Sequence, residues 1–271
     1  TYNGVVLGEG ALTDGKLTVD LSGITETGEL VFVGSSSLNN TTYIFNVNVL
    51  LATKIIRNED DLNVIRVTQE NINNNTSIFG YYVLANDISL SWKTLPETSL
   101  TYTEAVHYKA DFGFRGTFDG RGHTISRFAV TRNGIFGHVG KGAVIKNVNF
   151  DRLTYNKSWY ATLFGFTVRG AEISNVNISL AGYNLDESAK HTQGFLAARY
   201  MQDNKLTNVK IDASEFGVYT VFGQTVSNNT CSGVEIKVKS YTTLGFTNDT
   251  VSDATMIHKM DGVTVITADT T

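Results

Sequence analysis

The sequence is poor in cysteine, proline and charge. Its 271 residues include one Cys, Cys231, and one Pro, Pro96. A single thiol cannot form a disulfide within the chain, so the sequence does not encode a disulfide framework. Charged residues make up 18% of the chain, the formal net charge is −4 and no basic run occurs, which argues against nucleic acid as a partner. No apolar run reaches the length of a transmembrane helix, and we expect no insertion into a membrane.

The chain contains a six-residue pattern that occurs six times. Its clearest copies are residues 145–150 (IKNVNF) and 173–178 (ISNVNI), with apolar residues at positions one, four and six and polar residues at two and five. Successive copies begin 20 to 33 residues apart, a spacing typical of solenoids and other repeat arrays. The copies begin at Ile125, Ile145, Ile173, Leu206, Cys231 and Met260.

The phase of the apolar positions predicts a corner within each copy. In a straight strand the same face recurs every second residue, so positions four and six share a face but position one does not. A bend at position three restores the phase, and that position is Asn or Gly in five of the six copies. These residues reach the left-handed backbone region at least cost. Each copy is therefore predicted to be two short strands joined by a corner, with Cys231 as one of the buried apolar residues.

A second shared segment precedes four of the copies and adds a third strand to each repeat. No segment shows the long 3.6-residue apolar period of a helical solenoid. We therefore predict an all-β fold, a right-handed parallel β-helix of about seven coils over residues 54–271. The shared segments are residues 134–137, 162–165, 194–197 and 220–223.

Residues 1–53 are predicted to form a separate, immunoglobulin-like β-sandwich module. Alternating or continuous apolar residues indicate strands at 17–21, 30–33 and 43–49, separated by turn residues. These strands are few for a complete sandwich, so the module is partial or takes strands from elsewhere.

A short amphipathic helix is predicted over residues 57–66. Asn58 is a favourable N-cap, the first turn is acidic, and Leu62 and Ile65 lie on one face. Such a helix would cover the open end of the β-helix core.

Three further segments resemble a known family. Residues 86–90 (NDISL), 114–125 (FRGTFDGRGHTI) and 134–178, which include GIFGHVGKGAVIKNVNF and LFGFTVRGAEISNVNI, are similar to the right-handed parallel β-helix proteins of bacterial surfaces that carry GLUG-like repeats, often after an immunoglobulin-like module. The resemblance covers roughly residues 55–240, and the FDGRGHTI phrase also looks like the first coil of pectate-lyase-like β-helices. In the LFG phrase, Phe takes the place of the family's usual small residue. The resemblance implies extracellular display and adhesion or glycan contact.

Aromatic residues in the loops that follow the six-residue copies are the first candidate site. Loops from stacked coils emerge along one side of the molecule, where aromatic rings could stack on sugars. The competing interpretation is that the rings pack on the protein's own surface. The candidates are Tyr155, Trp159, Tyr160, Tyr183, Tyr219 and Tyr241.

A cluster of acidic and basic residues in the first coils is the alternative site, for catalysis on a polysaccharide. Several of these residues stand in Gly-containing turns, where Asp side chains commonly bond their own backbone. The five His residues lack metal-ligand spacing, and no cofactor motif occurs, so we expect neither a metal nor a cofactor. The cluster comprises Asp87, Asp111, Arg115, Asp119, Arg121 and His123.

The sequence therefore favours a non-enzymatic, surface-exposed adhesive β-helix that binds glycan or a host or partner surface protein. The expected location is extracellular, at a cell surface or virion surface. One alternative is a virion fibre or tail component, which could form a homo-oligomer and would suit a chain that begins at Thr1 as a processed piece. The other alternative is a polysaccharide lyase or glycoside hydrolase.

Overall fold

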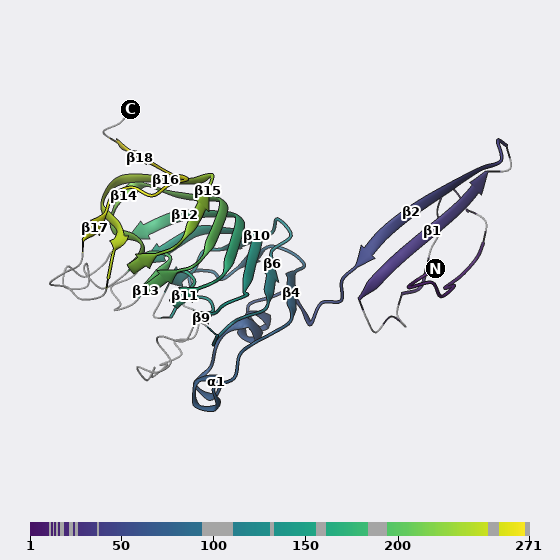
Figure 1. Cartoon of the computed structure of the whole chain (residues 1–271), viewed down its shortest axis with the longest axis horizontal. Helices are drawn as coiled ribbons and strands as arrows, with labels where there is room; N and C mark the ends of the chain where they lie inside the picture. Colours follow the sequence, from purple (N-terminus) through teal and green to yellow (C-terminus); the bar gives the residue numbers. More distant parts are fainter. Residues whose placement is uncertain are drawn as a thin grey trace. The chain divides into compact units, whose positions relative to one another are not determined.

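The protein divides into two compact units, Thr1–Thr53 and Lys54–Thr271. The computed structural model describes residues 1–10, 12, 14, 16, 19–21, 24, 27–36, 38–93, 111–130, 133–155, 161–183, 194–248 and 255–268. Strands dominate both units (Figure 1). The predicted all-β class is confirmed at this level.

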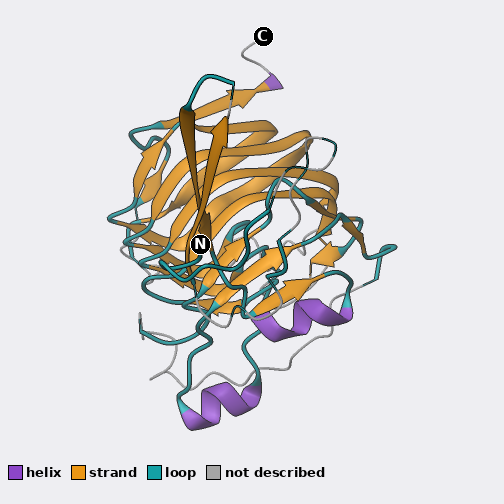
Figure 2. Cartoon of the chain, turned by 90° about the vertical axis from the view of Figure 1, so that its right-hand side faces the viewer, coloured by secondary structure: helices purple, strands orange, loops and turns teal. Residues whose placement is uncertain are grey.

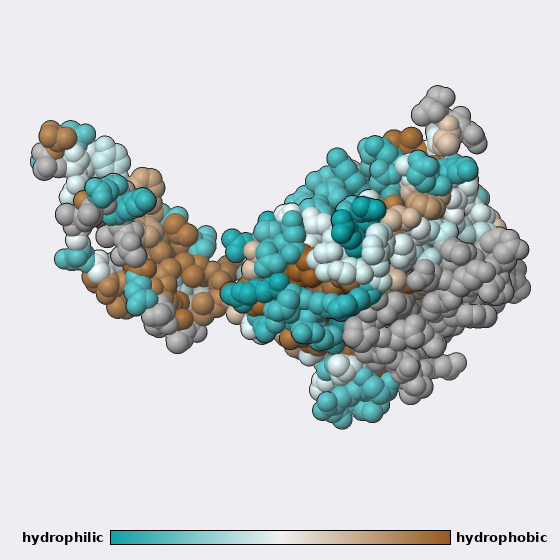
Figure 3. Space-filling view, turned by 180° about the vertical axis from the view of Figure 1, so that it is seen from behind, coloured by the Kyte–Doolittle hydropathy of each residue, from teal (hydrophilic) through white to brown (hydrophobic). Residues whose placement is uncertain are grey.

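The first unit holds one two-stranded antiparallel sheet. Strands β1 (Gly28–Ser36) and β2 (Thr41–Val49) pair along their whole length. Most apolar residues of β2 are exposed, Phe45 by 62%, and much of this unit is brown in Figure 3. Val19, Asp20 and Leu21 are not in a strand. The described residues of this unit therefore do not form the predicted sandwich, because two paired strands provide no second layer to cover their apolar side chains.

The second unit is built on a long parallel ladder that contains the six-residue copies. Ile145 pairs with Ile173, Ile173 with Leu206, and Leu206 with Cys231, so position one of four copies is aligned across four strands. All described strands of this unit belong to a single hydrogen-bonded sheet. Strands make up most of this unit in Figure 2. The ladder strands are β3 (Lys54–Ile56), β4 (Tyr81–Leu84), β6 (Thr117–Asp119), β10 (Val144–Tyr155), β12 (Glu172–Tyr183), β14 (Lys205–Ser227), β15 (Thr230–Ser232), β16 (Val234–Phe246) and β18 (Val263–Thr267).

Shorter strands extend this arrangement on either side. Strands β5 and β7 pair with each other, and β7 and β8 pair with the later part of β10. A second parallel ladder runs from β9 through β11 and β13 to the end of β14. These strands are β5 (Ile88–Ser89), β7 (Thr124–Ser126), β8 (Ala129–Val130), β9 (Gly137–Val139), β11 (Gly165–Arg169), β13 (Ala197–Gln202) and β17 (Met256–Ile257), the last antiparallel to β16.

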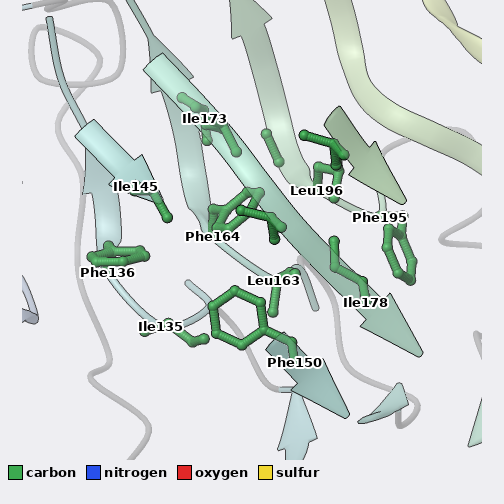
Figure 4. Close-up of a cluster of buried hydrophobic side chains, with 14 of the residues drawn as sticks. Ile135, Phe136, Ile145, Phe150, Leu163, Phe164, Ile173, Ile178, Phe195 and Leu196 are labelled. Atoms are coloured by element: carbon green, nitrogen blue, oxygen red, sulfur yellow. The ribbon is translucent and has the colours of Figure 1, made fainter. Parts of the chain in front are cut away.

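The core lies between the two ladders. Phe136 and Phe164, which directly precede β9 and β11, point towards Ile145, Phe150 and Ile173 of the long ladder (Figure 4). The ring centroids of Phe150 and Phe164 are 6.1 Å apart, with the rings edge to face. All five side chains are at most 1% exposed. The shared segments that contain Phe136 and Phe164 therefore supply one wall of the core, and the six-residue copies supply the other.

The corners lie at the predicted position. Asn147, Asn175 and Asn208 have φ values of +53°, +54° and +53°, and Gly233 has +63°. One copy was assigned to the wrong place, however. Ile125 pairs with Phe150 rather than with Ile145, so its corner residue, Arg127, belongs to a second corner further along the strand. Both corners follow an apolar residue by two positions, so the spacing alone does not distinguish them.

The predicted helix at residues 57–66 is one short 3₁₀ segment, η1 (Asp60–Ile65). The side chain of Asn58 accepts a hydrogen bond from the backbone N–H of Asp61, as a cap would, although η1 begins after Glu59. Leu62 and Ile65 are buried in the core as predicted. A second helix that the sequence analysis did not predict, α1 (Gln69–Asn74), follows it.

Candidate binding face

A column of hydrogen-bonded side chains follows the asparagine corner. The Asn175 Nδ2 donates to Asn147 Oδ1 over 3.0 Å, and the Asn208 Nδ2 donates to Asn175 Oδ1 over 2.9 Å. The Asn147 Nδ2 in turn donates to Asp119 Oδ1 over 3.1 Å. The left-handed backbone that turns each corner also aligns these amides, because it repeats at matched positions of adjacent strands. All three bonds point the same way, which lets them polarise one another.

The column ends on the Asp119 carboxylate, which is largely buried. It accepts hydrogen bonds from the Arg121 backbone N–H (2.9 Å) and the Tyr81 hydroxyl (3.1 Å), and Lys146 Nζ lies 3.4 Å away. Burial alone would raise the pKa of Asp119. The hydrogen bonds from Arg121, Asn147 and Tyr81, together with the charge of Lys146, outweigh it and lower the pKa below the ordinary value.

A second column of amides lies two residues further along each strand. The Asn149 Nδ2 donates to the Gly122 carbonyl, and the Asn177 Nδ2 donates to Asn149 Oδ1 over 2.8 Å. Beyond it, the Ser179 hydroxyl donates to Asp151 Oδ1 over 2.6 Å. Two parallel amide columns thus run across neighbouring strands, which are spaced about 4.8 Å apart.

The two columns enclose a shallow depression of about 710 Å³. We call its lining the amide face; it consists of Asp119, Arg121, Gly122, Asn147, Asn149, Asn175 and Asn177. A carboxamide offers two N–H donors and an oxygen with two lone pairs. The column uses one N–H and one lone pair on each of Asn147 and Asn175. The remaining N–H donors and oxygen lone pairs can bind a ligand that both donates and accepts hydrogen bonds.

The structure separates the acidic and basic cluster that the sequence predicted as an alternative site. Asp119 and Arg121 lie in the amide face. The Asp87 carboxylate lies 3.2 Å from His123 Nδ1 and accepts a hydrogen bond from a backbone N–H. Arg115 instead donates to the carbonyl groups of Asp111 and Lys141. Arg115 and Asp111 are therefore joined through a backbone carbonyl, and neither residue lines the amide face.

The stacking role predicted for the aromatic residues is wrong for Tyr155. Its side chain is 1% exposed, its ring stacks on Phe195 at 4.8 Å, and its hydroxyl donates to the Phe195 carbonyl. Tyr183 packs against Tyr155 and the core, and burial raises the pKa of both hydroxyls.

The other predicted aromatic residues have different positions. Tyr241 is half-buried, and its hydroxyl donates to the His258 carbonyl. Tyr219 is also half-buried. Trp159 and Tyr160 lie outside the described residues. The four described aromatics therefore lie in strands rather than in the predicted loops, and Tyr155, Tyr183 and Tyr241 contact the protein itself.

Comparisons with protein-family models, curated proteins and solved structures find no match. Among the described residues, no group of three or more His, Cys, Asp or Glu side chains could hold a metal ion. The same residues include no helix long and apolar enough to cross a membrane.

The sequence analysis found the asparagines of the first column but gave them only a conformational role. Asn147, Asn175 and Asn208 were identified as corner residues, and Asn149 and Asn177 merely as polar residues at position five. The signal that could have revealed the face is the recurrence of Asn at both positions in adjacent copies. Matched positions of parallel strands lie side by side, so repeated Asn predicts a column.

Proposed function

We propose that the second unit is a right-handed parallel β-helix that serves as a non-enzymatic, surface-displayed module and binds a glycan through the amide face. The observation that carries the proposal is the pair of hydrogen-bonded amide columns beside the depression. The crossover connection between two parallel strands of one sheet is right-handed in nearly all known cases, which supports the proposed right-handed coil. The bacterial-surface family that the sequence resembles has the same architecture.

A glycan suits this face better than a protein does. Protein interfaces generally have an apolar or aromatic centre, whereas the amide face is lined by amides, one carboxylate, one guanidinium and a glycine. Sugar hydroxyls both donate and accept hydrogen bonds, as carboxamides do. The columns repeat these groups at the strand spacing, so an extended saccharide could bind several of them at once.

A binding role suits Asp119 better than acid catalysis does. A glycosidase acid needs a raised pKa so that it stays protonated, whereas the pKa of Asp119 is lowered. Both of its carboxylate oxygens already accept hydrogen bonds from neighbouring groups. Asp119 is therefore an ionised acceptor that anchors the first column.

The test is a glycan array probed with the intact chain and with an Asn149→Ala/Asn177→Ala variant. These positions lie on the second column, outside the left-handed corners, so alanine should leave the backbone unchanged. We expect the variant to lose binding on the order of tenfold or more. The matched control is Glu172→Ala/Lys205→Ala, which removes an exposed pair with its charged atoms 4.0 Å apart on the same long ladder.

Three results would distinguish glycan binding at the amide face from its alternatives. Loss of binding in the asparagine variant alone supports the amide face. Equal binding by all three proteins excludes the face as the site. Shortened glycan products after incubation with the intact chain would show that the protein is an enzyme.

A further inference from the structure

A second group of side chains lies at the other corner of the same strands. The Trp92 backbone N–H donates to the Arg127 carbonyl over 2.6 Å, and the Arg127 N–H donates to the Asp151 carbonyl over 3.0 Å. Trp92, Arg127 and Arg152 therefore occupy one corner in three successive strand layers. Their φ values are +66°, +56° and +56°, in the left-handed region that bulky residues rarely adopt. We call these three residues the arginine corner.

The side chains of the arginine corner are available to a ligand. The Arg152 guanidinium lies 5.6 Å from the centroid of the Trp92 ring, and Trp92 is still 45% exposed. Both arginines are exposed. Among the residues that the structure describes, neither guanidinium has an ion-pair partner.

The acidic groups near the corner are already engaged. Asp151, next to Arg152, accepts a hydrogen bond from the Ser179 hydroxyl. Glu59 forms an ion pair with Lys93, the neighbour of Trp92, over 3.0 Å. Within the described part of the chain, the two guanidinium groups thus form no ion pair, and that of Arg152 lies beside the exposed indole of Trp92.

We propose that the arginine corner is a subsite for the carboxylate or sulfate group of an acidic polysaccharide. Guanidinium groups bind such anions through paired, charge-assisted hydrogen bonds, and the indole can stack on a sugar ring. The two arginines stand in neighbouring layers about 4.8 Å apart, so they can meet anionic groups on consecutive sugars of one chain. This inference rests on the proposed function, because it assigns an acidic glycan to the same molecule.

Nucleic acid is a poorer fit for this corner. Binding to it depends on many Lys and Arg contacts along a phosphate backbone. The chain has a net charge of −4 and no basic run. Two arginines on one corner are enough for local recognition of acidic sugars but not for a nucleic-acid footprint.

The corner is adjacent to the amide face. Arg152 follows Asn149 by three residues on the same strand, which corresponds to about 10 Å. One saccharide could therefore contact both. Its hydroxyls would bind the amides, and its charged group would bind the arginines.

The test compares two probes by calorimetry: a short oligogalacturonate and its fully methyl-esterified form, which differ in charge. For the intact chain at low salt we expect the acid form to bind about tenfold more tightly or better. Arg127→Gln/Arg152→Gln should abolish this preference but leave binding of the ester unchanged. The matched control, Lys141→Gln/Lys259→Gln, removes the same charge from exposed sites elsewhere and should keep the preference.

An Arg127→Lys/Arg152→Lys variant guards against a folding defect, since it keeps the charge and loses only the paired hydrogen bonds. It should show an intermediate preference. The inference is overturned if the intact chain does not prefer the acid form, or if the glutamine variant, shown by circular dichroism to be folded, retains the preference. Loss of ester binding in Asn149→Ala/Asn177→Ala tests the proposed function separately, so the two can fail independently.

Discussion

Asn147 and Asn175 are 28 residues apart in the chain, yet their side-chain amides are joined by a hydrogen bond of 3.0 Å. Both residues have a left-handed backbone and stand at the same corner of adjacent parallel strands. One residue type therefore does two things at this position: it turns the strand, and it links the turn to its neighbour. This double role makes the corner testable by mutation.

Substitutions of Asn175 should separate the two roles. Asn175→Ala removes both the ease of left-handed backbone and the two hydrogen bonds, so we expect a loss of about 2–4 kcal/mol in the free energy of unfolding. Asn175→Gly keeps the backbone, as Gly233 does at the same corner, and should lose only about 1–2 kcal/mol. Urea denaturation measures both. Equal losses would mean that the backbone conformation contributes nothing.

The Asp119 carboxylate should make stability depend on pH. Its folded-state pKa lies below the ordinary value of 3.8, so its stabilisation is complete well above pH 3.8 and is lost as the pH falls through the folded value. We expect Asp119→Asn to lower the free energy of unfolding by about 1.5–3 kcal/mol at neutral pH, and the difference from the wild type to shrink in acid. Asp60→Asn, at an exposed carboxylate, is the control. A difference that stays constant down to pH 2 would contradict this account.

Tyr155 should behave as a core residue. Tyr155→Phe removes one buried hydroxyl whose acceptor, the Phe195 carbonyl, also receives the Leu163 N–H, so the expected loss is small, about 0.5–1 kcal/mol. Tyr155→Ala leaves a cavity and should cost about 3–5 kcal/mol. Thermal denaturation checks both values. Ligand binding that falls in the Phe variant without loss of stability would return Tyr155 to the list of binding residues.

Burial of Tyr155 also predicts sensitivity to alkali. Its raised pKa means that stabilisation is present below the ordinary value of 10.0 and is lost as the pH rises through the folded value. Tyr155→Phe should therefore lose less stability than the wild type between neutral pH and pH 11, as measured by urea denaturation at each pH. Parallel curves for the two proteins would count against this explanation.

Two glycines with positive φ offer a matched pair. At Gly134 (φ +59°) a Cβ atom would lie 2.5 Å from the Leu163 carbonyl oxygen, whereas at Gly142 (φ +89°) it would meet nothing within 4 Å. Gly142→Ala should cost only the backbone strain, about 1–2 kcal/mol. Gly134→Ala should cost clearly more, because the neighbouring backbone at Thr162 and Leu163 must move. The free energy of unfolding of the two variants gives the comparison, and equal costs would exclude a close approach at Gly134.

Much of the larger unit could be predicted from the sequence because its signal is periodic. The phase break between positions one and four of each copy predicts the corner, and Asn or Gly at position three marks its place. The second corner was missed because Arg127 and Arg152 adopt left-handed backbone without the usual residue type. The loop position predicted for Tyr155 was wrong because a tyrosine that follows a strand pattern is equally compatible with a loop and with the core. The sandwich predicted for the first unit is absent from the described residues for a different reason. The pattern of a strand does not indicate whether a second sheet covers that strand.

The central claim is that five of the six-residue copies stack in parallel and in register, and a distance measurement tests it most directly. Asn149 pairs with Asn177, Asn177 with Lys210, and Lys210 with Glu235, which separates Asn149 from Glu235 by three strand spacings. Nitroxide labels on Asn149→Cys and Glu235→Cys, in a Cys231→Ser background, report this separation by electron paramagnetic resonance. Stacked strands predict Cα atoms about 14 Å apart, broadened by the label linkers. A distribution centred beyond about 25 Å, more than five strand spacings, would contradict the account.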